Sequence, residues 1–205
     1  MKRNKLIIFI LAGIIYYTSE AQSSAEINMG STRIAVEAAL RHYFDAKEKW
    51  RVHTFDRVFY LYNDKSIGFF TFNSFSYYTK SGIGLSLNLI GDINKFHTSM
   101  GLTYEKKIHH LYLYFFTTYS LNSTGLNEDY FMLVYDRPFI KNTKLIFKNE
   151  FYASFVKWTY DNSYHRIKLG IEFKQTQIGF FNETSQKSVK NTLAINLGCY
   201  LKQGF

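Results

Sequence analysis

NTLAINLGCYLKQGF, residues 191–205, alternates almost strictly in the character of its side chains. The even positions are polar, small or tyrosine, and the odd positions from residue 193 are apolar except for Gln203: Leu193, Ile195, Leu197, Cys199, Leu201 and Phe205. Successive side chains of a β-strand point to opposite faces, so this period of two predicts a strand with two different surroundings. What lies against its apolar face decides the fold.

The same alternation recurs upstream. It is clear in 82–92, 96–105, 110–115, 144–155 and 166–173, whereas 50–62, 67–78, 128–136 and 177–183 are aromatic on both faces. These segments have the length of a tilted bilayer crossing, about 9 to 11 residues. We therefore predict an all-β protein, a transmembrane antiparallel up-and-down barrel of about ten strands over residues 50–205, with eight or twelve strands as alternatives.

The composition supports a nearly continuous sheet. The chain has 20 Phe, 17 Tyr and a single proline, Pro138. Aromatic residues favour strands, and proline is kept out of central strands because it cannot donate a ladder hydrogen bond. The one cysteine, Cys199, excludes an intramolecular disulfide. The net charge of +9 favours anionic surroundings such as acidic lipid head groups, and nucleic acid is not an expected partner.

Residues 1–21 have the pattern of a secretory signal peptide. Lys2, Arg3 and Lys5 precede an apolar run from Leu6 to Tyr17, and Ser19 and Ala21 are small residues at the expected cleavage site. The apolar run is shorter than the roughly 20 residues that a transmembrane helix needs. We expect cleavage after Ala21 and export of residues 22–205.

Residues 22–49 are ambiguous. Within 31–47, Ile34, Val36 and Leu40 share one face of a strand, but the AVEAAL run, residues 35–40, also has high helix propensity. A single extra strand would make an odd number, and single-chain bacterial barrels have even numbers. The segment is therefore a helix, a plug or an additional strand that pairs with a further crossing.

Turn signals between the expected strands alternate in length. The connections 79–82, 105–109, 137–142 and 174–175 are short, and 120–129, 157–163 and 183–191 are long. Outer-membrane barrels have short periplasmic turns and longer external loops, so the pattern predicts that the C-terminus lies on the periplasmic side.

Charged residues share the polar face of the clearest strands. The candidates for lining the lumen are Lys144, Lys148, Glu150, Arg166, Lys168, Glu172 and Lys202. A charge that faces lipid is costly, so a membrane barrel must keep its charges inside. A soluble β-sandwich also excludes charge from its core, so the alternation alone does not separate the two folds. Mixed signs favour a salt-linked plug, and the excess of cations favours a thin, anion-preferring pore.

The ending LGCYLKQGF resembles the C-terminal strand of outer-membrane β-barrel proteins of Gram-negative bacteria. Leu197, Cys199, Leu201 and the terminal Phe205 match that pattern, whereas Gln203 stands where an apolar residue or tyrosine is usual. The resemblance is architectural and covers about residues 50–205. It implies an outer-membrane location and recognition of the C-terminal strand by the barrel-assembly machinery, with outer-membrane lipid, lipopolysaccharide and other envelope proteins as neighbours. It carries over no activity.

Catalytic motifs are scarce. His97, Ser99 and Glu105 share one strand face, as a lipid-modifying enzyme of the outer membrane requires, but a hydrated polar lumen is the preferred explanation for them. His109 and His110 are adjacent and so point to opposite strand faces, which disfavours a shared metal ion. We expect no cofactor, no metal and no catalytic residue. The leading hypothesis is a narrow porin-like channel for small hydrophilic or anionic solutes, and the alternative is an accessory barrel with a filled lumen.

Overall fold

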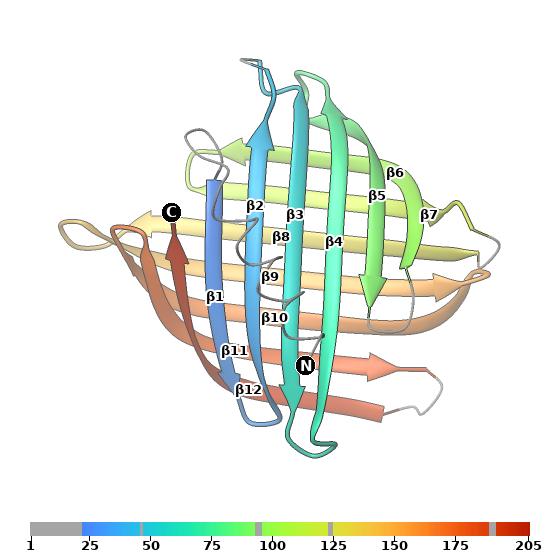
Figure 1. Ribbon diagram of the computed structural model, residues 1–205. Helices are drawn as coiled ribbons and strands as arrows, with labels where there is room; N and C mark the ends of the chain where they lie inside the picture. Colours follow the sequence, from blue (N-terminus) through green and yellow to red (C-terminus); the bar gives the residue numbers. More distant parts are fainter. Residues whose placement is uncertain (1–21, 46, 93–95, 123–124, 189–191) are drawn as a thin grey trace, which may run out of the picture.

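The computed structural model describes residues 22–45, 47–92, 96–122, 125–188 and 192–205. The expected signal peptide, residues 1–21, lies outside the described residues. The described chain is built from β-strands and short turns (Figure 1). The strands are β1 (Gln22–Gly30), β2 (Arg33–Tyr43), β3 (Trp50–Leu61), β4 (Ser66–Tyr78), β5 (Ile83–Asp92), β6 (Phe96–Ile108), β7 (Leu111–Ser120), β8 (Leu126–Pro138), β9 (Thr143–Val156), β10 (Thr159–Phe173), β11 (Thr176–Lys187) and β12 (Thr192–Gly204).

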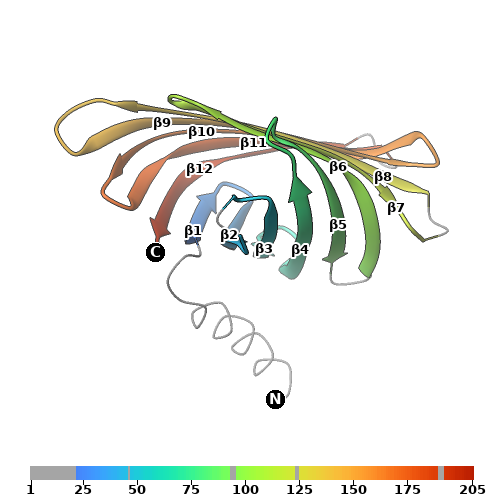
Figure 2. The ribbon, with the colours of Figure 1, turned by 90° about the horizontal axis from the view of Figure 1, so that it is seen from above.

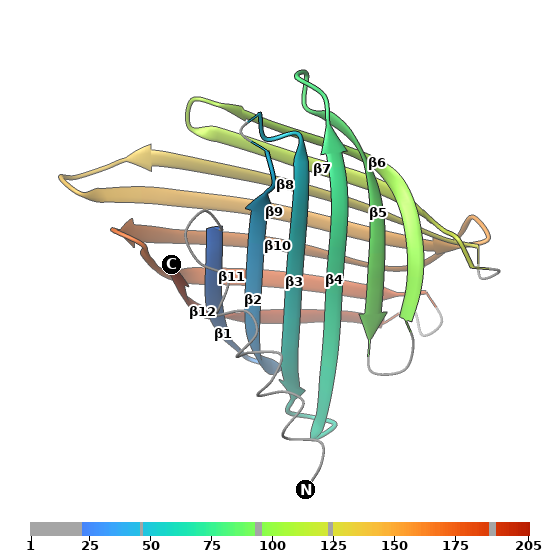
Figure 3. The same ribbon diagram turned by 45° about the horizontal axis from the view of Figure 1, so that its top comes forward.

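The strands close into one antiparallel barrel. Each strand pairs with its neighbours in sequence, and β1 pairs with β12 to seal the sheet. Seen from above, β1–β4 lie opposite the wall that contains β9–β11 (Figure 2). The strands of these two walls cross steeply because they are tilted around a common axis (Figures 1 and 3). Closure leaves no unpaired strand edge.

The predicted all-β antiparallel barrel is confirmed, but the preferred number of about ten strands is wrong, since the barrel has twelve. The two additional strands come from residues 22–49, which form β1 and β2. The helix propensity of the alanine-rich run is overridden because β2 pairs along its whole length with β3 and from Ile34 to Arg41 with β1. The even count is kept because β1 supplies the further crossing.

The long connections expected at one end of the barrel are replaced by longer strands. β7 runs to Ser120 and β8 begins at Leu126, while β10 already begins at Thr159. β11 continues to Lys187. Many of the polar residues that suggested loops, such as those of 126–129, 159–163 and 183–187, are strand residues, since a strand that projects beyond an apolar belt no longer needs an apolar face. Loop length therefore does not orient this barrel.

The barrel wall is polar inside and apolar outside. On β5, the outward Leu87 is 56% exposed and the inward Asn88 is 2% exposed. The exposed apolar residues of other strands include Ile27, Met100, Leu169, Phe180, Leu197 and Leu201. A soluble sandwich buries its apolar face and exposes its polar face, which is the reverse of this arrangement. The structure thus excludes the sandwich alternative. Helices long and apolar enough to cross a bilayer do not occur in the part of the chain that the structure describes.

Candidate functional site in the barrel interior

All seven charged residues that the sequence suggested for the lumen lie on the inward-facing parity of their strands. Lys144, Lys148 and Glu150 come from β9, Arg166, Lys168 and Glu172 from β10, and Lys202 from β12. These residues differ in burial. Glu150, Arg166 and Lys168 are buried, whereas Lys144 is exposed near the end of the barrel.

Arg166 is the centre of an ionic network. Its guanidinium lies 2.5 Å from Glu183, 3.0 Å from Glu37 and 3.6 Å from Glu150. The side chain is 3% exposed. Charge-assisted hydrogen bonds between guanidinium and carboxylate are strong in such a buried setting because water does not compete for them. Arg166 therefore ties β10 to β2 on the opposite wall and to β9 and β11 beside it.

Four further ion pairs extend this network around the barrel. Arg57 lies 2.7 Å from Glu37, and Lys148 lies 3.0 Å from Glu150. Two more pairs join residues of distant strands: Arg33 with Glu183, and Lys168 with Glu26. We name the part of the interior that contains these residues and Arg166 the ionic half. Each of its carboxylates is neutralised by a cation, so the interior is not a uniformly basic tube.

A second ionic cluster was missed by the sequence analysis. Glu105 binds both Arg41, at 3.2 Å, and Arg51, and Tyr112 also donates a hydrogen bond to it at 2.9 Å. Arg51 also contacts Tyr78. The alternation of side chains along β3 could have placed Arg51 on the inward face. The aromatic residues on both faces of that strand obscured the pattern.

The interior also holds an aromatic cluster of Phe72, Ile90, Tyr114 and Phe116, with Phe55, Phe70, Tyr112, Tyr130 and Met132 packed against it. The rings of Phe72 and Phe116 stack with centroids 5.3 Å apart, and Phe116 stacks on Tyr130 at the same distance. Tyr130 donates a hydrogen bond of 2.6 Å to Glu150, which joins this aromatic half to the ionic half. The interior is therefore divided rather than uniformly open.

The three residues of the enzymatic alternative are bound to different partners. His97 lies 3.2 Å from Glu128, and Ser99 accepts a hydrogen bond of 3.4 Å from Asn88. Glu105 belongs to the arginine cluster. These side chains thus form hydrogen bonds and ion pairs with other residues of the inner wall and not with one another. In the described part of the chain, no group of three His, Cys, Asp or Glu residues is placed to hold a metal ion.

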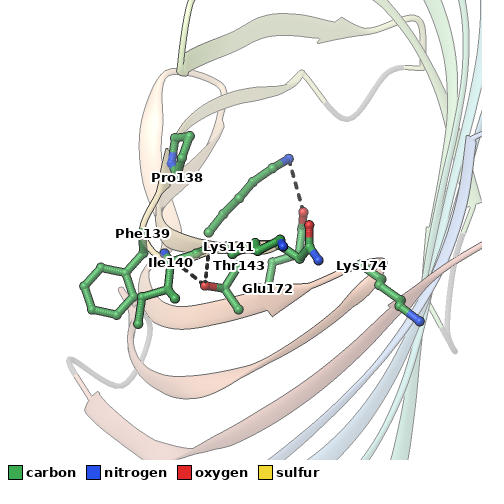
Figure 4. Close-up of a pocket in the computed structure, with 9 residues that line it drawn as sticks. Pro138, Phe139, Ile140, Lys141, Thr143, Glu172 and Lys174 are labelled. Atoms are coloured by element: carbon green, nitrogen blue, oxygen red, sulfur yellow. Dashed lines mark hydrogen bonds and ion pairs between the residues drawn. The ribbon is translucent and has the colours of Figure 1, made fainter.

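A cavity of about 800 Å³ opens at the end of the barrel that carries the C-terminus. It is lined by residues 138–144 of the β8–β9 connection together with Glu172 and Lys174 (Figure 4). Lys144 bridges Glu172 at 3.3 Å and Asp136 at 3.5 Å. Three lysines, Lys141, Lys144 and Lys174, and one glutamate, Glu172, line this mouth and make it polar and basic.

Tyr200 explains a glycine on the inner wall. The Tyr200 side chain crosses β11 and reaches Gly170 on β10, where an added Cβ would lie 2.2 Å from the Tyr200 hydroxyl. Lys168 lies 5.2 Å from the centroid of the same ring. Glycine is needed at position 170 because the ring occupies the space of a side chain.

We predict that Gly170→Val destabilises the barrel by about 1–3 kcal/mol, because overpacking displaces the buried ring. The measurement is the free energy of unfolding by urea titration in lipid vesicles. Gly204→Ala is the matched control, since an added Cβ there meets its nearest neighbour only at 3.6 Å. Tyr200→Ala should relieve only the part of the defect of Gly170→Val that comes from the ring, because the backbone carbonyl of Ile178 also lies 2.6 Å from the added Cβ. A double variant with no gain at all over Gly170→Val would contradict a role for the ring.

Comparisons with known proteins support the architecture. No protein-family model matches the chain, and no curated protein matches it. The KdgM porin superposes with a TM-score of 0.55 at 12% identity, over 90% of this chain and 99% of the porin. The NanC porin gives a TM-score of 0.55 at 6% identity, over 89% and 98% of the two chains. An outer membrane channel from Pseudomonas putida gives a TM-score of 0.52 at 9% identity, over 92% and 97%.

At these identities the likeness shows the fold alone. The chain has the fold of a small outer-membrane β-barrel protein, which confirms the architecture that the C-terminal strand suggested.

Proposed function

We propose that this protein is a narrow porin-like channel of the outer membrane that passes small hydrophilic solutes, with a preference for anions. The proposal rests on the distribution of side chains in the closed barrel, whose wall is apolar on the outside and charged on the inside. The likeness to porins supports it. The apolar outer face supports a position in lipid, and the resemblance of the C-terminal strand favours the outer membrane.

The ionic half offers the path for solutes. Lys148 and Arg33 are 23% and 19% exposed, although both bind carboxylates. In contrast, Phe72, Tyr114 and Phe116 are buried in one another. A solute would therefore move along charged side chains, past the aromatic half, and the conductance should be small.

The solute class follows from the chemistry of the lining. Guanidinium groups bind carboxylates and phosphates in a planar, bidentate geometry, so the partly exposed Arg33 can exchange a protein carboxylate for that of a solute. One related structure is described as the KdgM porin in complex with disordered oligogalacturonate, an acidic oligosaccharide. That description concerns the porin, but it supports an anionic solute for an arginine-lined barrel of this fold.

Single-channel recording in planar bilayers tests the proposal. We expect small discrete openings and, under a salt gradient, a reversal potential that shows anion preference. The absence of openings at any voltage, with barrel folding verified by a heat-dependent shift on gels, would reject a channel.

An accessory barrel is the second candidate, and the filled aromatic half favours it. Such a barrel would act through partners in the envelope, so mild detergent extraction should recover it with other proteins.

We also propose that the protein has no catalytic role. His97→Ala should then leave the composition of lipid A unchanged, and an altered lipid A profile would contradict that proposal.

Membrane placement predicts a large cost for a charge on the outer face. Leu87→Arg should destabilise the barrel by about 2–4 kcal/mol in lipid vesicles, as expected for an arginine near the bilayer midplane. Leu87→Met is the control, because it keeps an apolar side chain of similar volume. Equal stability of the two variants in urea titrations would mean that Leu87 does not face lipid.

The proposed partner for assembly is the machinery that inserts barrels into the outer membrane. Phe205 directly follows β12 and is exposed, and its backbone N–H donates a hydrogen bond of 2.9 Å to the carbonyl of Ser23. Deleting Phe205 should reduce the amount of folded barrel in outer-membrane fractions severalfold while leaving in vitro folding into detergent intact. Normal insertion of the deletion variant would argue against recognition of this residue.

A further inference from the structure

The outer wall of the barrel is not apolar everywhere. Thr54 and Asp56 on β3 and Thr71 and Asn73 on β4 have the outward parity of their strands, opposite to the inward Arg57 and Phe72. The register pairs Asp56 with Thr71 and Thr54 with Asn73, so the four form one patch. Asn73 donates a hydrogen bond of 2.9 Å to Thr71, whose hydroxyl lies beside the carboxylate of Asp56; Thr71 itself is 5% exposed. We call these four residues the acidic patch.

The acidic patch lies midway along its strands, between apolar neighbours toward both ends of the barrel. Val52 and Phe75 flank it on one side, and Val58 and Phe69 on the other. Ion pairs among the described residues join inward-facing or turn side chains, so Asp56 has a hydroxyl rather than a cation as its partner. A carboxylate at this height facing hydrocarbon is unfavourable, and polar groups within the membrane mark contacts with other polar groups.

A second polar patch lies on the wall of β9–β11. Asn149, His165, Asn182 and Thr184 have the outward parity there, since the inward positions hold Glu150, Arg166 and Glu183. His165 lies 2.6 Å from the side-chain oxygen of Asn149, and the register places Thr184 directly beside His165. We call these four residues the imidazole patch.

The two patches occupy opposite walls at a similar height. β3 and β4 lie across the barrel from β9–β11 in both Figure 1 and Figure 2. Asp56 lies near the middle of β3, and Asn149, His165 and Asn182 lie near the middle of their strands. Two upright barrels related by a simple shift in the membrane plane would therefore bring the acidic patch of one copy against the imidazole patch of the next.

We propose that copies of this chain associate side by side, with the acidic patch of one barrel bound to the imidazole patch of its neighbour. The carboxylate of Asp56 accepts hydrogen bonds from the amide of Asn182 and from Nδ1–H of a protonated His165, whose Nε2–H donates to Asn149, and the amide of Asn73 has amide partners opposite. A two-fold contact between acidic patches would instead place two carboxylates together, which repel. Because the patches lie on opposite walls, the contact is heterologous and repeats into rows of barrels.

Disulfide trapping in membranes tests this contact. In a Cys199→Ser background, a chain with both Asp56→Cys and His165→Cys should form a ladder of dimers, trimers and longer species after mild oxidation. Each single-cysteine chain alone should stay monomeric, whereas a mixture of the two should give one mixed dimer. Phe115→Cys with His165→Cys is the control, since Phe115 faces outward on β7, between the two walls.

Several outcomes would overturn the contact. Homodimers of the Asp56→Cys chain would show a two-fold interface, and a ladder no stronger than that of the control pair would show random collision. Cross-links to a different protein at Asp56→Cys would assign the patch to another partner. The inference rests on the proposed membrane placement but not on conduction: a chain that conducts without cross-linking rejects only the rows, whereas a chain absent from membranes rejects the placement itself.

Discussion

Replacing Phe72 and Phe116 together by alanine should raise the single-channel conductance severalfold. The two rings stack at 5.3 Å and belong to the aromatic cluster in the barrel interior. Their removal opens a water-accessible space beside the ionic half, because the polar hydroxyls of Tyr114 and Tyr130 then line it. We expect a loss of stability of about 3–5 kcal/mol per buried ring as an upper limit, since water can enter the space.

Phe151→Ala is the matched control for this experiment. Phe151 is an aromatic residue of similar size on the outward face of β9. Its removal should leave the conductance unchanged and affect only contacts with lipid. If the double alanine variant folds and conducts no better than the unmodified protein, solutes do not pass the aromatic half, and the accessory role gains support.

Arg166→Met should destabilise the folded barrel by about 3–5 kcal/mol, the effect expected when a buried ion pair loses one partner. The substitution leaves Glu37, Glu150 and Glu183 facing one another without their shared guanidinium. Each carboxylate retains a second cation, namely Arg57, Lys148 and Arg33 respectively, so the effect should fall at the lower end of that range. Urea unfolding in lipid vesicles, followed by tryptophan fluorescence, measures it.

Lys144→Met provides the contrast. Lys144 also bridges two carboxylates, but it is about half exposed at the barrel mouth, and such pairs contribute only about 0–1 kcal/mol. Equal losses for Arg166→Met and Lys144→Met would show that the interior is hydrated well enough to solvate the carboxylates.

Much of the wall could be read from single strands. Parity placed Lys148, Glu150, Arg166 and Lys168 on one face of their strands, and it placed Leu197 and Leu201 on the other face of β12. This succeeded because alternation is a local property: a strand's two faces follow from its backbone alone. Local patterns failed where both faces are aromatic, so the cluster of Phe72 and Phe116 was missed.

The partners of the charged residues could not be found in this way. Arg166 and Glu37 are separated by 129 positions in sequence, and Lys168 and Glu26 by 142. Whether two such groups meet depends on how many strands close the barrel and in what register. Those quantities are set by the sum of all strand pairings, including β1 with β12.

The sequence by itself determined that this chain is a continuous antiparallel sheet with one apolar and one charged face, because a period of two is encoded residue by residue. Only the tertiary structure decided that residues 22–49 complete a barrel of twelve strands, that its interior divides into ionic and aromatic halves, and that two polar patches face outward on opposite walls. The physical reason is that closure is a collective property. Each strand finds its place by satisfying the backbone hydrogen bonds of both neighbours, and no single strand contains that information.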